Sequence, residues 1–134
     1  MSAAPGAAYF DSSALVKLVV PEPESEALRN EARGWPQHVS SAIVRVEVVR
    51  ACARVDSAAR TVAEEVVSAL DLVAVDDELL DAAALVRPVG LRSLDAIHVA
   101  SARLLGGALG VVFAYDDRLA AAMGSAGLPV AAPR

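Results

Sequence analysis

The sequence predicts an α/β fold in three layers, with a parallel sheet in the middle and helices on both of its faces. Short apolar runs alternate with longer segments of helical period, and no Ser/Gly-rich linker, charge block or repeat interrupts them. The 134 residues, 55% of them hydrophobic, are enough for one core, so a single domain over residues 1–134 is expected. Parallel strands joined by helices place a ligand crevice at the carboxyl ends of the strands.

The N-terminal part begins with a short apolar run. Ala7 to Phe10 predicts the first strand, which ends at Asp11. Ser12 or Ser13 can cap the helix that follows. A second helix is expected over Glu24 to Ala32, because the helix macrodipole favours its acidic first turn.

The middle of the chain continues the same alternation. His38 to Ser40 predicts the second strand, and Ser41 is expected to cap a helix from Ala42 to about Arg54. Ser57 to Leu70 predicts another helix, and Leu72 to Val75 predicts the third strand.

The C-terminal part completes the pattern. Asp77 to Arg87 predicts a helix with acids at its start, and Ser93 is expected to cap an almost wholly apolar helix that continues to Leu105. A glycine-rich turn then leads to the strand Val111 to Ala114, and a last helix covers about Asp117 to Ala126.

Composition and charge exclude several classes of protein. Twelve Lys and Arg against 17 Asp and Glu give a net charge of -5, the wrong sign for a protein that coats nucleic acid non-specifically. The single cysteine, Cys52, cannot form an internal disulfide and is expected to be a small buried hydrophobe. Met1 to Ala8 lacks the features of a signal peptide, and the longest uncharged stretch, Leu119 to Pro133, is too short and too broken to cross a membrane. We therefore expect a soluble cytoplasmic protein without membrane contact.

Two acids follow predicted strands directly. Asp11 comes after the first strand, and Asp116 follows the strand Val111 to Ala114 after one residue. Both would project from the carboxyl edge of the sheet into one crevice. The alternative is that each aspartate only caps the helix behind it.

A glutamate falls on the apolar face of a predicted helix. Glu47 belongs to a stripe with i, i+3, i+4 spacing that also contains Val44 and Val48, so its carboxylate is expected to point inward. A carboxylate out of water needs a partner or a metal ion. The alternative to a functional role is a salt bridge to Arg45, Arg50 or another helix.

A fourth acid begins the most apolar helix. Asp95 lies in its first turn and is also expected to point inward. The alternative is an aspartate favoured by the macrodipole and bonded to His98 one turn on. Metal ligation by His98 is open at this spacing, but a hydrogen-bonded core histidine is the preferred interpretation.

The four acids would repel one another and raise one another's pKa, because no lysine is expected beside them. A bound cation would relieve the repulsion. All-oxygen ligation without a cysteine cluster favours Mg²⁺ or Mn²⁺ over zinc. The chemistry indicated is in-line attack of a metal-activated water on a phosphodiester.

Four segments around these acids resemble, in the same order, the motifs of PIN-domain nucleases, specifically the VapC-like toxins of prokaryotic toxin-antitoxin pairs. The segments are Tyr9 to Lys17 (YFDSSALVK), Arg45 to Ala51 (RVEVVRA), Ser93 to Ala102 (SLDAIHVASA) and Phe113 to Leu119 (FAYDDRL). The resemblance covers nearly the whole chain. It implies a PIN-domain-like three-layer sandwich and a single PIN domain over residues 1–134.

The resemblance also implies an activity, an endoribonuclease that depends on Mg²⁺, with Mn²⁺ as a substitute. The acids implied to be both catalytic and metal-binding are Asp11, Glu47, Asp95 and Asp116. Ser13 is implied to support them as a substrate-positioning residue. The family pattern favours Asp116 over Asp117 as the fourth acid, which leaves Asp117 as a helix cap. Such a toxin cuts RNA, is held inactive by a cognate antitoxin made alongside it, and is expected to form a homodimer.

One residue departs from the family pattern. The family usually carries Thr or Ser two residues before the fourth acid, and here the residue is Ala114. A PIN-fold module that has lost catalysis and only binds RNA or an antitoxin therefore stays open. A phosphoacceptor receiver domain is a further alternative, but its expected lysine is missing, since the only lysine is Lys17. Tyr115 could stack on a base or belong to the core. The candidate arginine contacts to RNA are Arg45, Arg50, Arg87, Arg92 and Arg118.

Overall fold

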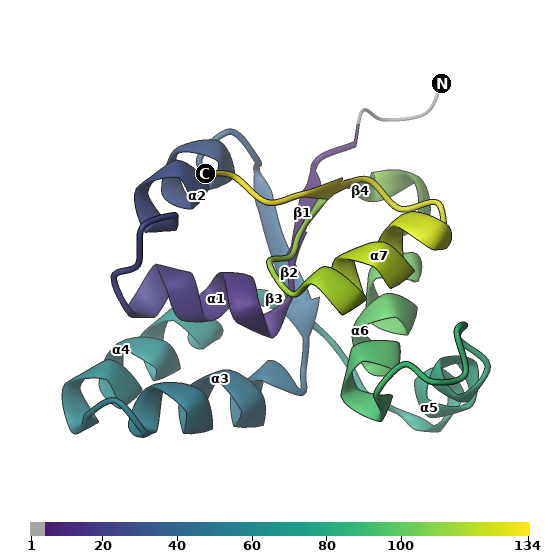
Figure 1. Cartoon of the computed structure of the whole chain (residues 1–134), viewed down its shortest axis with the longest axis horizontal. Coiled ribbons are helices and arrows are strands. Elements are labelled where there is room, and N and C mark those ends of the chain that lie inside the picture. The colour runs from purple at the N-terminus through teal and green to yellow at the C-terminus, as the bar shows by residue number, and fades with distance from the viewer. Residues whose placement is uncertain (1–4) are drawn as a thin grey trace.

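The computed structural model describes residues 5–134, and over them the chain forms one parallel sheet of five strands in the order β3-β2-β1-β4-β5 (Figure 1). Every neighbouring pair in this order is parallel. The strands are β1 (Ala7–Phe10), β2 (Gln37–Ser41), β3 (Asp71–Val73), β4 (Leu109–Phe113) and β5 (Val130–Ala131). The predicted α/β fold with a central parallel sheet is confirmed.

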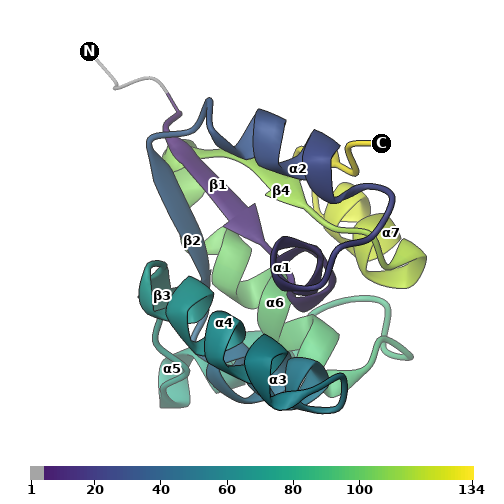
Figure 2. The same cartoon turned by 90° about the vertical axis from the view of Figure 1, so that its left-hand side faces the viewer.

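Helices cover both faces of the sheet. One face carries α1 (Ser12–Val19), α2 (Ser25–Ala32), α3 (Val44–Ala53) and α4 (Ser57–Ser68). The other carries α5 (Asp77–Ala84), α6 (Ser93–Arg103) and α7 (Asp117–Ser125), and a short 3₁₀ turn, Gly106–Ala108, precedes β4. Figure 2, which views the molecule from the α1–α4 side, shows α2, α1 and the α3–α4 pair following one another down this face.

The side chains of β1 divide between the two cores, because successive residues of a strand point to opposite faces. Ala8 and Phe10 pack under α1 to α4, whereas Ala7 and Tyr9 pack under α5 to α7. All four residues are at most 1% exposed. Such burial is typical of a central strand in a parallel sheet, and it fixes the position of the residue that follows, Asp11.

The predicted caps of two helices are wrong, because aspartates replace the expected residues. Asp11, rather than Ser12 or Ser13, caps α1, and its carboxylate accepts the Ala14 backbone N–H at 2.8 Å. An aspartate just before a helix serves this purpose well. For the same reason α7 is capped by Asp116, whose carboxylate accepts the Leu119 N–H at 3.0 Å.

Three residues that were predicted as helix caps occupy other positions. Asp117, predicted as a cap, is the first residue of α7. Ser93 is likewise the first residue of α6, and the N-cap is Arg92. Ser41 ends β2, so α3 begins only at Val44, after the N-cap Ile43.

The remaining differences concern the lengths of elements. The helices α4 and α5 end two or three residues earlier than predicted, at Ser68 and Ala84. The two-residue strand β5 has no counterpart in the sequence prediction, because so short a segment shows no periodicity.

Three further expectations concern the cysteine, the N-terminal segment and membrane-spanning helices. The free thiol of Cys52 is buried in the core under α1 to α4, as predicted. Of the Met1 to Ala8 segment, which was expected to lack a signal peptide, residues 1–4 lie outside the described part of the chain. Over residues 5–134, the helices are too short or too polar for any of them to traverse a lipid bilayer.

Candidate active site

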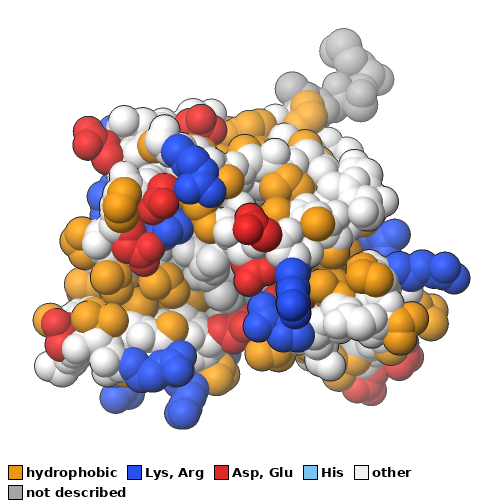
Figure 3. Space-filling model, viewed as in Figure 1, with side chains coloured by type: hydrophobic (Ala, Val, Ile, Leu, Met, Phe, Trp, Pro, Cys, Tyr) orange, Lys and Arg blue, Asp and Glu red, His pale blue; other side chains and the backbone are white. Residues whose placement is uncertain are grey.

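A cavity of about 150 Å³ lies at the carboxyl edge of the sheet, lined by residues from the starts of α1, α6 and α7 and from α3. Figure 1 shows β1 and β4 ending where α1 and α7 begin. The residues that line the cavity are Asp11, Ser12, Ser13, Glu47, Arg92, Asp95, His98, Asp116 and Leu119. The structure thus brings together all four predicted acids and Ser13, from segments spread over a hundred positions. Figure 3 shows acidic side chains gathered at the centre of this face, between α1 and α7, with basic side chains directly beside them.

Asp11 is the most deeply placed of the acids, at 1% exposure. Its two carboxylate oxygens accept the Ser13 hydroxyl at 2.7 and 2.8 Å, and one of them also accepts the Ala14 N–H. The Ser13 oxygen in turn accepts the Tyr115 backbone N–H at 3.0 Å. Burial raises the pKa of Asp11 to about 6, although the hydrogen bonds from Ser13 and Ala14 oppose this rise. Ser13 therefore ties the loop after β4 to the first acid.

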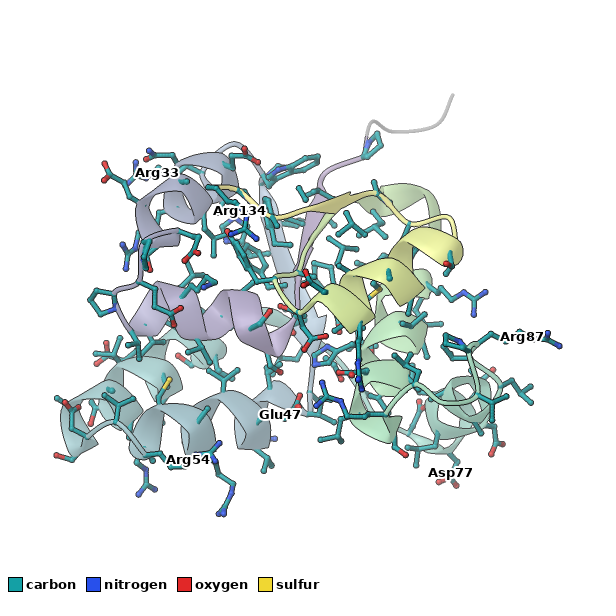
Figure 4. All side chains as sticks on the ribbon, in the orientation of Figure 1. Arg33, Glu47, Arg54, Asp77, Arg87 and Arg134 are labelled. Atoms are coloured by element: carbon teal, nitrogen blue, oxygen red, sulfur yellow. The ribbon has the colours of Figure 1, made fainter. Side chains whose placement is uncertain are left out.

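Glu47 reaches the cavity from α3 and is held by two polar side chains. In Figure 4 its side chain is directed toward the space between α1 and α6, whereas Arg54 at the other end of α3 projects outward. Its Oε1 accepts the Ser12 hydroxyl at 2.7 Å and lies 3.0 Å from Nε2 of His98. Burial acts to raise the pKa of Glu47, but the hydrogen bonds from His98 and Ser12 outweigh it and lower the pKa.

His98 is buried, and its two ring nitrogens have different partners. Nδ1 lies 2.6 Å from the Tyr9 hydroxyl, and Nε2 faces Glu47. Burial raises the pKa of Tyr9 well above its usual range, so its hydroxyl stays protonated and donates to Nδ1. Because the ionised carboxylate of Glu47 can only accept, Nε2 of His98 is the donor in this contact. Tyr9, His98 and Glu47 form a chain of hydrogen bonds from the core to the cavity.

Asp95 and Asp116 share one partner, the guanidinium of Arg92. Its Nε donates to Asp95 Oδ2 at 3.1 Å, and its Nη2 donates to Asp116 Oδ2 at 3.3 Å. The side chain of Arg92 is 65% exposed. This half of the cavity wall is therefore held from the solvent side by a single long side chain.

These contacts refine the sequence-based expectations. Burial is the main cause of the raised pKa of Asp11, and the negative charge of Asp116 raises it further, as expected, whereas the pKa of Glu47 is lowered. No lysine was expected beside the acids, and an arginine, Arg92, lies between two of them. Within the described residues, Glu47 pairs with His98 rather than with Arg45 or Arg50.

The expected partner of Asp95 also differs. Its carboxylate contacts Arg92, while His98 hydrogen-bonds Tyr9, Ser12 and Glu47. His98 is thus a hydrogen-bonded buried histidine, as the preferred interpretation had it, and it also lines the cavity.

The acids are not gathered into a ready-made metal site. Among residues 5–134, no three His, Cys, Asp or Glu side chains converge closely enough to hold an ion. Each of the four carboxylates contacts a protein donor instead. The donor set still suits a hard divalent cation, since it consists of carboxylate and hydroxyl oxygens on one wall.

Comparison with known proteins identifies the family. Residues 8–124 match the PIN domain family. The chain belongs to this family. The resemblance that four short motifs suggested is therefore confirmed over most of the chain.

Relatives of this PIN domain extend over nearly its full length. It is 47% identical to "Ribonuclease VapC46" of Mycobacterium tuberculosis (strain ATCC 25618 / H37Rv) over 127 residues, which cover 95% of this chain and 98% of the relative. "Ribonuclease VapC35" of the same strain is 36% identical over 129 residues, 93% of this chain and 96% of the relative. "Ribonuclease VapC47" of strain CDC 1551 / Oshkosh is 33% identical over 130 residues, with 93% and 96% covered. The PIN domain is thus a homologue of the VapC ribonucleases.

Ser13 was expected to support the acids, and it does bond Asp11, but the partners of Glu47 in this PIN domain were not predicted. Tyr9, Ser12 and His98 reach Glu47 only through contacts between segments 35 to 89 positions apart, which no local pattern reveals. Arg92 could have been found, because it stands three residues before Asp95 at the start of the same helix.

Three residues singled out earlier lie outside the cavity wall. Ala114 is 1% exposed and packs in the core under α5 to α7. It has no hydroxyl to offer the site, and the serine that holds Asp11 is Ser13. Tyr115 donates its hydroxyl to the Pro133 carbonyl at 2.7 Å and packs against the other core, which favours the core interpretation. Lys17 pairs with Glu22 and Glu24, away from the four acids.

Proposed function

We propose that this protein is a metal-dependent endoribonuclease and the toxin of a toxin-antitoxin pair. The observation that carries the proposal is the single cavity that four carboxylates share, each from a different motif of a PIN domain. The names of its relatives, all VapC ribonucleases, support RNA as the substrate.

The four carboxylates, Asp11, Glu47, Asp95 and Asp116, would hold Mg²⁺, with Mn²⁺ as a substitute. When bound, the ion would polarise a phosphoryl oxygen of the RNA and activate a water molecule. Around it, Ser13 fixes the rotation of Asp11, while Ser12 and His98 fix Glu47. In this proposal the nucleophile is the metal-activated water, so the hydrolysis needs no covalent intermediate.

Selection of RNA would depend on local contacts, since the net charge of -5 gives no general attraction for phosphate. Arg92 lies on the wall of the cavity. Arg45, Arg50 and Arg118 are exposed and stay candidate contacts. Arg87 points away from the centre of the molecule in Figure 4 and is the weakest of the five candidates.

The proposal extends to a cognate antitoxin and a homodimer. Large apolar side chains left on the surface support association with a partner, and the most exposed of them are Leu85, at 82%, and Val89, at 96%. Light scattering of the protein with and without an antitoxin encoded beside it measures both states. A monomer that the antitoxin leaves unchanged would contradict this part.

The activity is tested with neighbouring aspartates that differ only in their position. Asp116 lines the cavity, whereas Asp117 is exposed on α7. We expect Asp116→Asn to lower Mg²⁺-dependent cleavage of single-stranded RNA by on the order of 10²-fold or more, because a metal ligand stabilises the transition state by several kcal/mol. Asp117→Asn, with the same charge change, should keep cleavage within about twofold.

Chelation of divalent ions should abolish cleavage by the wild-type protein. Purified protein that binds RNA but does not cut it in Mg²⁺ or Mn²⁺ would favour the binding module instead. Equal loss in the two asparagine variants would contradict the assignment of Asp116.

A further inference from the structure

Arg92 has an unusual place for a basic residue in an acidic site. Of the residues that line the cavity in the described part of the chain, it is the only lysine or arginine. Its guanidinium bridges two carboxylates that approach from different elements, Asp95 at the start of α6 and Asp116 just before α7. The proposed ion ligands on this side are thus the same atoms that Arg92 holds.

The contacts of Arg92 with the two carboxylates can be replaced by contacts with a ligand. The side chain of Arg92 is 65% exposed and that of Asp116 38%, so water screens this pair, while Asp95, at 13%, is the more buried partner. Nε and Nη2 make the two contacts to the acids, and among residues 5–134 no contact engages Nη1. Asp11 and Glu47, by contrast, are held by hydroxyl and imidazole donors inside the fold.

A guanidinium also matches the geometry of a phosphate group. Its planar array of N–H donors binds two phosphate oxygens at once, as it binds a carboxylate. A cavity walled by four acids repels the phosphodiester that it is proposed to cut, and Arg92 is the one lysine or arginine among the described residues on that wall. Its release from Asp95 and Asp116 would leave a free positive charge beside the reacting phosphate.

We propose that Arg92 alternates between two partners. It binds Asp95 and Asp116 in the metal-free protein, and it binds a phosphate of the RNA once a divalent cation takes these carboxylates. This inference rests on the proposed function and adds a substrate-positioning residue to it. It requires that Arg92 weakens metal binding and strengthens RNA binding, two opposite effects from one side chain.

The first half of the test measures Mn²⁺ binding alone by isothermal titration calorimetry. Arg92→Gln should bind Mn²⁺ roughly three- to tenfold more tightly than the wild-type protein, because no guanidinium competes for the acids. Arg103→Gln, which removes an exposed arginine from the other end of α6, should stay within about twofold. Arg92→Lys keeps the charge but loses the planar fork, so its affinity should fall between the two.

The second half measures binding of a short single-stranded RNA in an Asp11→Asn background that prevents cleavage, at a Mn²⁺ concentration high enough to saturate the weakened site. Arg92→Gln should weaken binding and lower the slope of log affinity against log salt by about 0.7, the value for one lost phosphate contact. Arg103→Gln should leave the slope unchanged. A merely structural role of Arg92 would not alter the salt slope.

The outcomes separate this inference from the proposed function. If the wild-type protein binds Mn²⁺ and Arg92→Gln binds it equally or more weakly, the exchange is wrong and the nuclease proposal stands. An unchanged salt slope in Arg92→Gln overturns the phosphate contact. If none of the proteins binds Mn²⁺, the metal site is wrong and the inference fails with it. Circular dichroism of each variant verifies that it is folded.

Discussion

The two halves of the cavity hold their carboxylates in opposite ways. Asp11 and Glu47 accept hydrogen bonds from Ser13, Ser12 and His98, which belong to the regular helices α1 and α6. Asp95 and Asp116 are instead bridged from the solvent side by Arg92. The first half is held by donors inside the fold, whereas the second, apart from the Leu119 N–H that Asp116 accepts as a helix cap, is held by a contact that a ligand can replace.

The difference follows from what lies beneath each half. Asp11 directly follows the buried strand β1, and Tyr9 of the same strand supports Glu47 through His98. A side chain supported in this way has few alternative rotamers. The bridge over the second half has no such support, since Arg92 is an exposed N-cap residue. A site that must bind both an ion and a charged substrate is served by two firmly held acids beside two acids whose arginine partner can be displaced.

The largest effect is expected from breaking the support of the rigid half. His98→Ala should lower RNA cleavage by roughly 10- to 100-fold, the usual cost of losing a residue that orients a metal ligand. Because His98 acts through Glu47, the double variant His98→Ala/Glu47→Gln should be no worse than Glu47→Gln alone. Single-turnover cleavage rates of the three proteins measure this. Additive losses would show that His98 acts independently of Glu47.

A smaller effect concerns stability without metal ions. Burial raises the pKa of Asp11 from 3.8 to about 6, so the folded protein binds this proton more tightly than the unfolded chain does. This contribution to the free energy of unfolding is present below about pH 4 and is lost as the pH rises to 6. Asp11→Asn keeps a side-chain oxygen for the Ala14 N–H and should be more stable than the wild-type protein at pH 7, by roughly 1–3 kcal/mol.

Urea denaturation from pH 4 to pH 8 in EDTA measures this difference. It should disappear toward pH 4, where the Asp11 carboxyl is protonated in the fold. Equal stability at pH 7 would contradict the burial cost assigned to Asp11.

The smallest effect distinguishes the two acids of the rigid half. The pKa of Glu47 is lowered in the fold, so its ionised form contributes stability above its usual pKa, and this contribution is lost as the pH falls. Glu47→Gln should therefore lower the stability at pH 7, by about 1 kcal/mol, where Asp11→Asn raises it. The same urea series measures the sign. If Glu47→Gln is more stable than the wild-type protein at pH 7, burial outweighs the hydrogen bonds at Glu47, as it does at Asp11.

The sequence was sufficient for the fold and for the positions of the acids. The buried run before Asp11 and the apolar stripe around Glu47 fix which way each carboxylate points, and both signals are local. The aspartates at two helix starts were expected to share one crevice, and they do while also capping their helices. Both interpretations of Asp11 thus hold together.

The polar partners could not be predicted in the same way. The contact between Tyr9 and His98 spans 89 positions and depends on how α6 packs on β1. Nor does a local pattern show that Arg92 reaches across to Asp116, 24 positions away. These partners lower the pKa of Glu47, whereas the expected repulsion between acids is present at Asp11, whose pKa the charge of Asp116 helps to raise.

The most direct test of a shared divalent-cation site is a Mn²⁺ titration followed by electron paramagnetic resonance. The wild-type protein should bind Mn²⁺ at a saturable site, and binding should weaken by roughly tenfold or more in each of Asp11→Asn, Glu47→Gln, Asp95→Asn and Asp116→Asn, while Asp117→Asn keeps it. Saturable binding that none of the four substitutions weakens, or no saturable binding at all, would contradict the account.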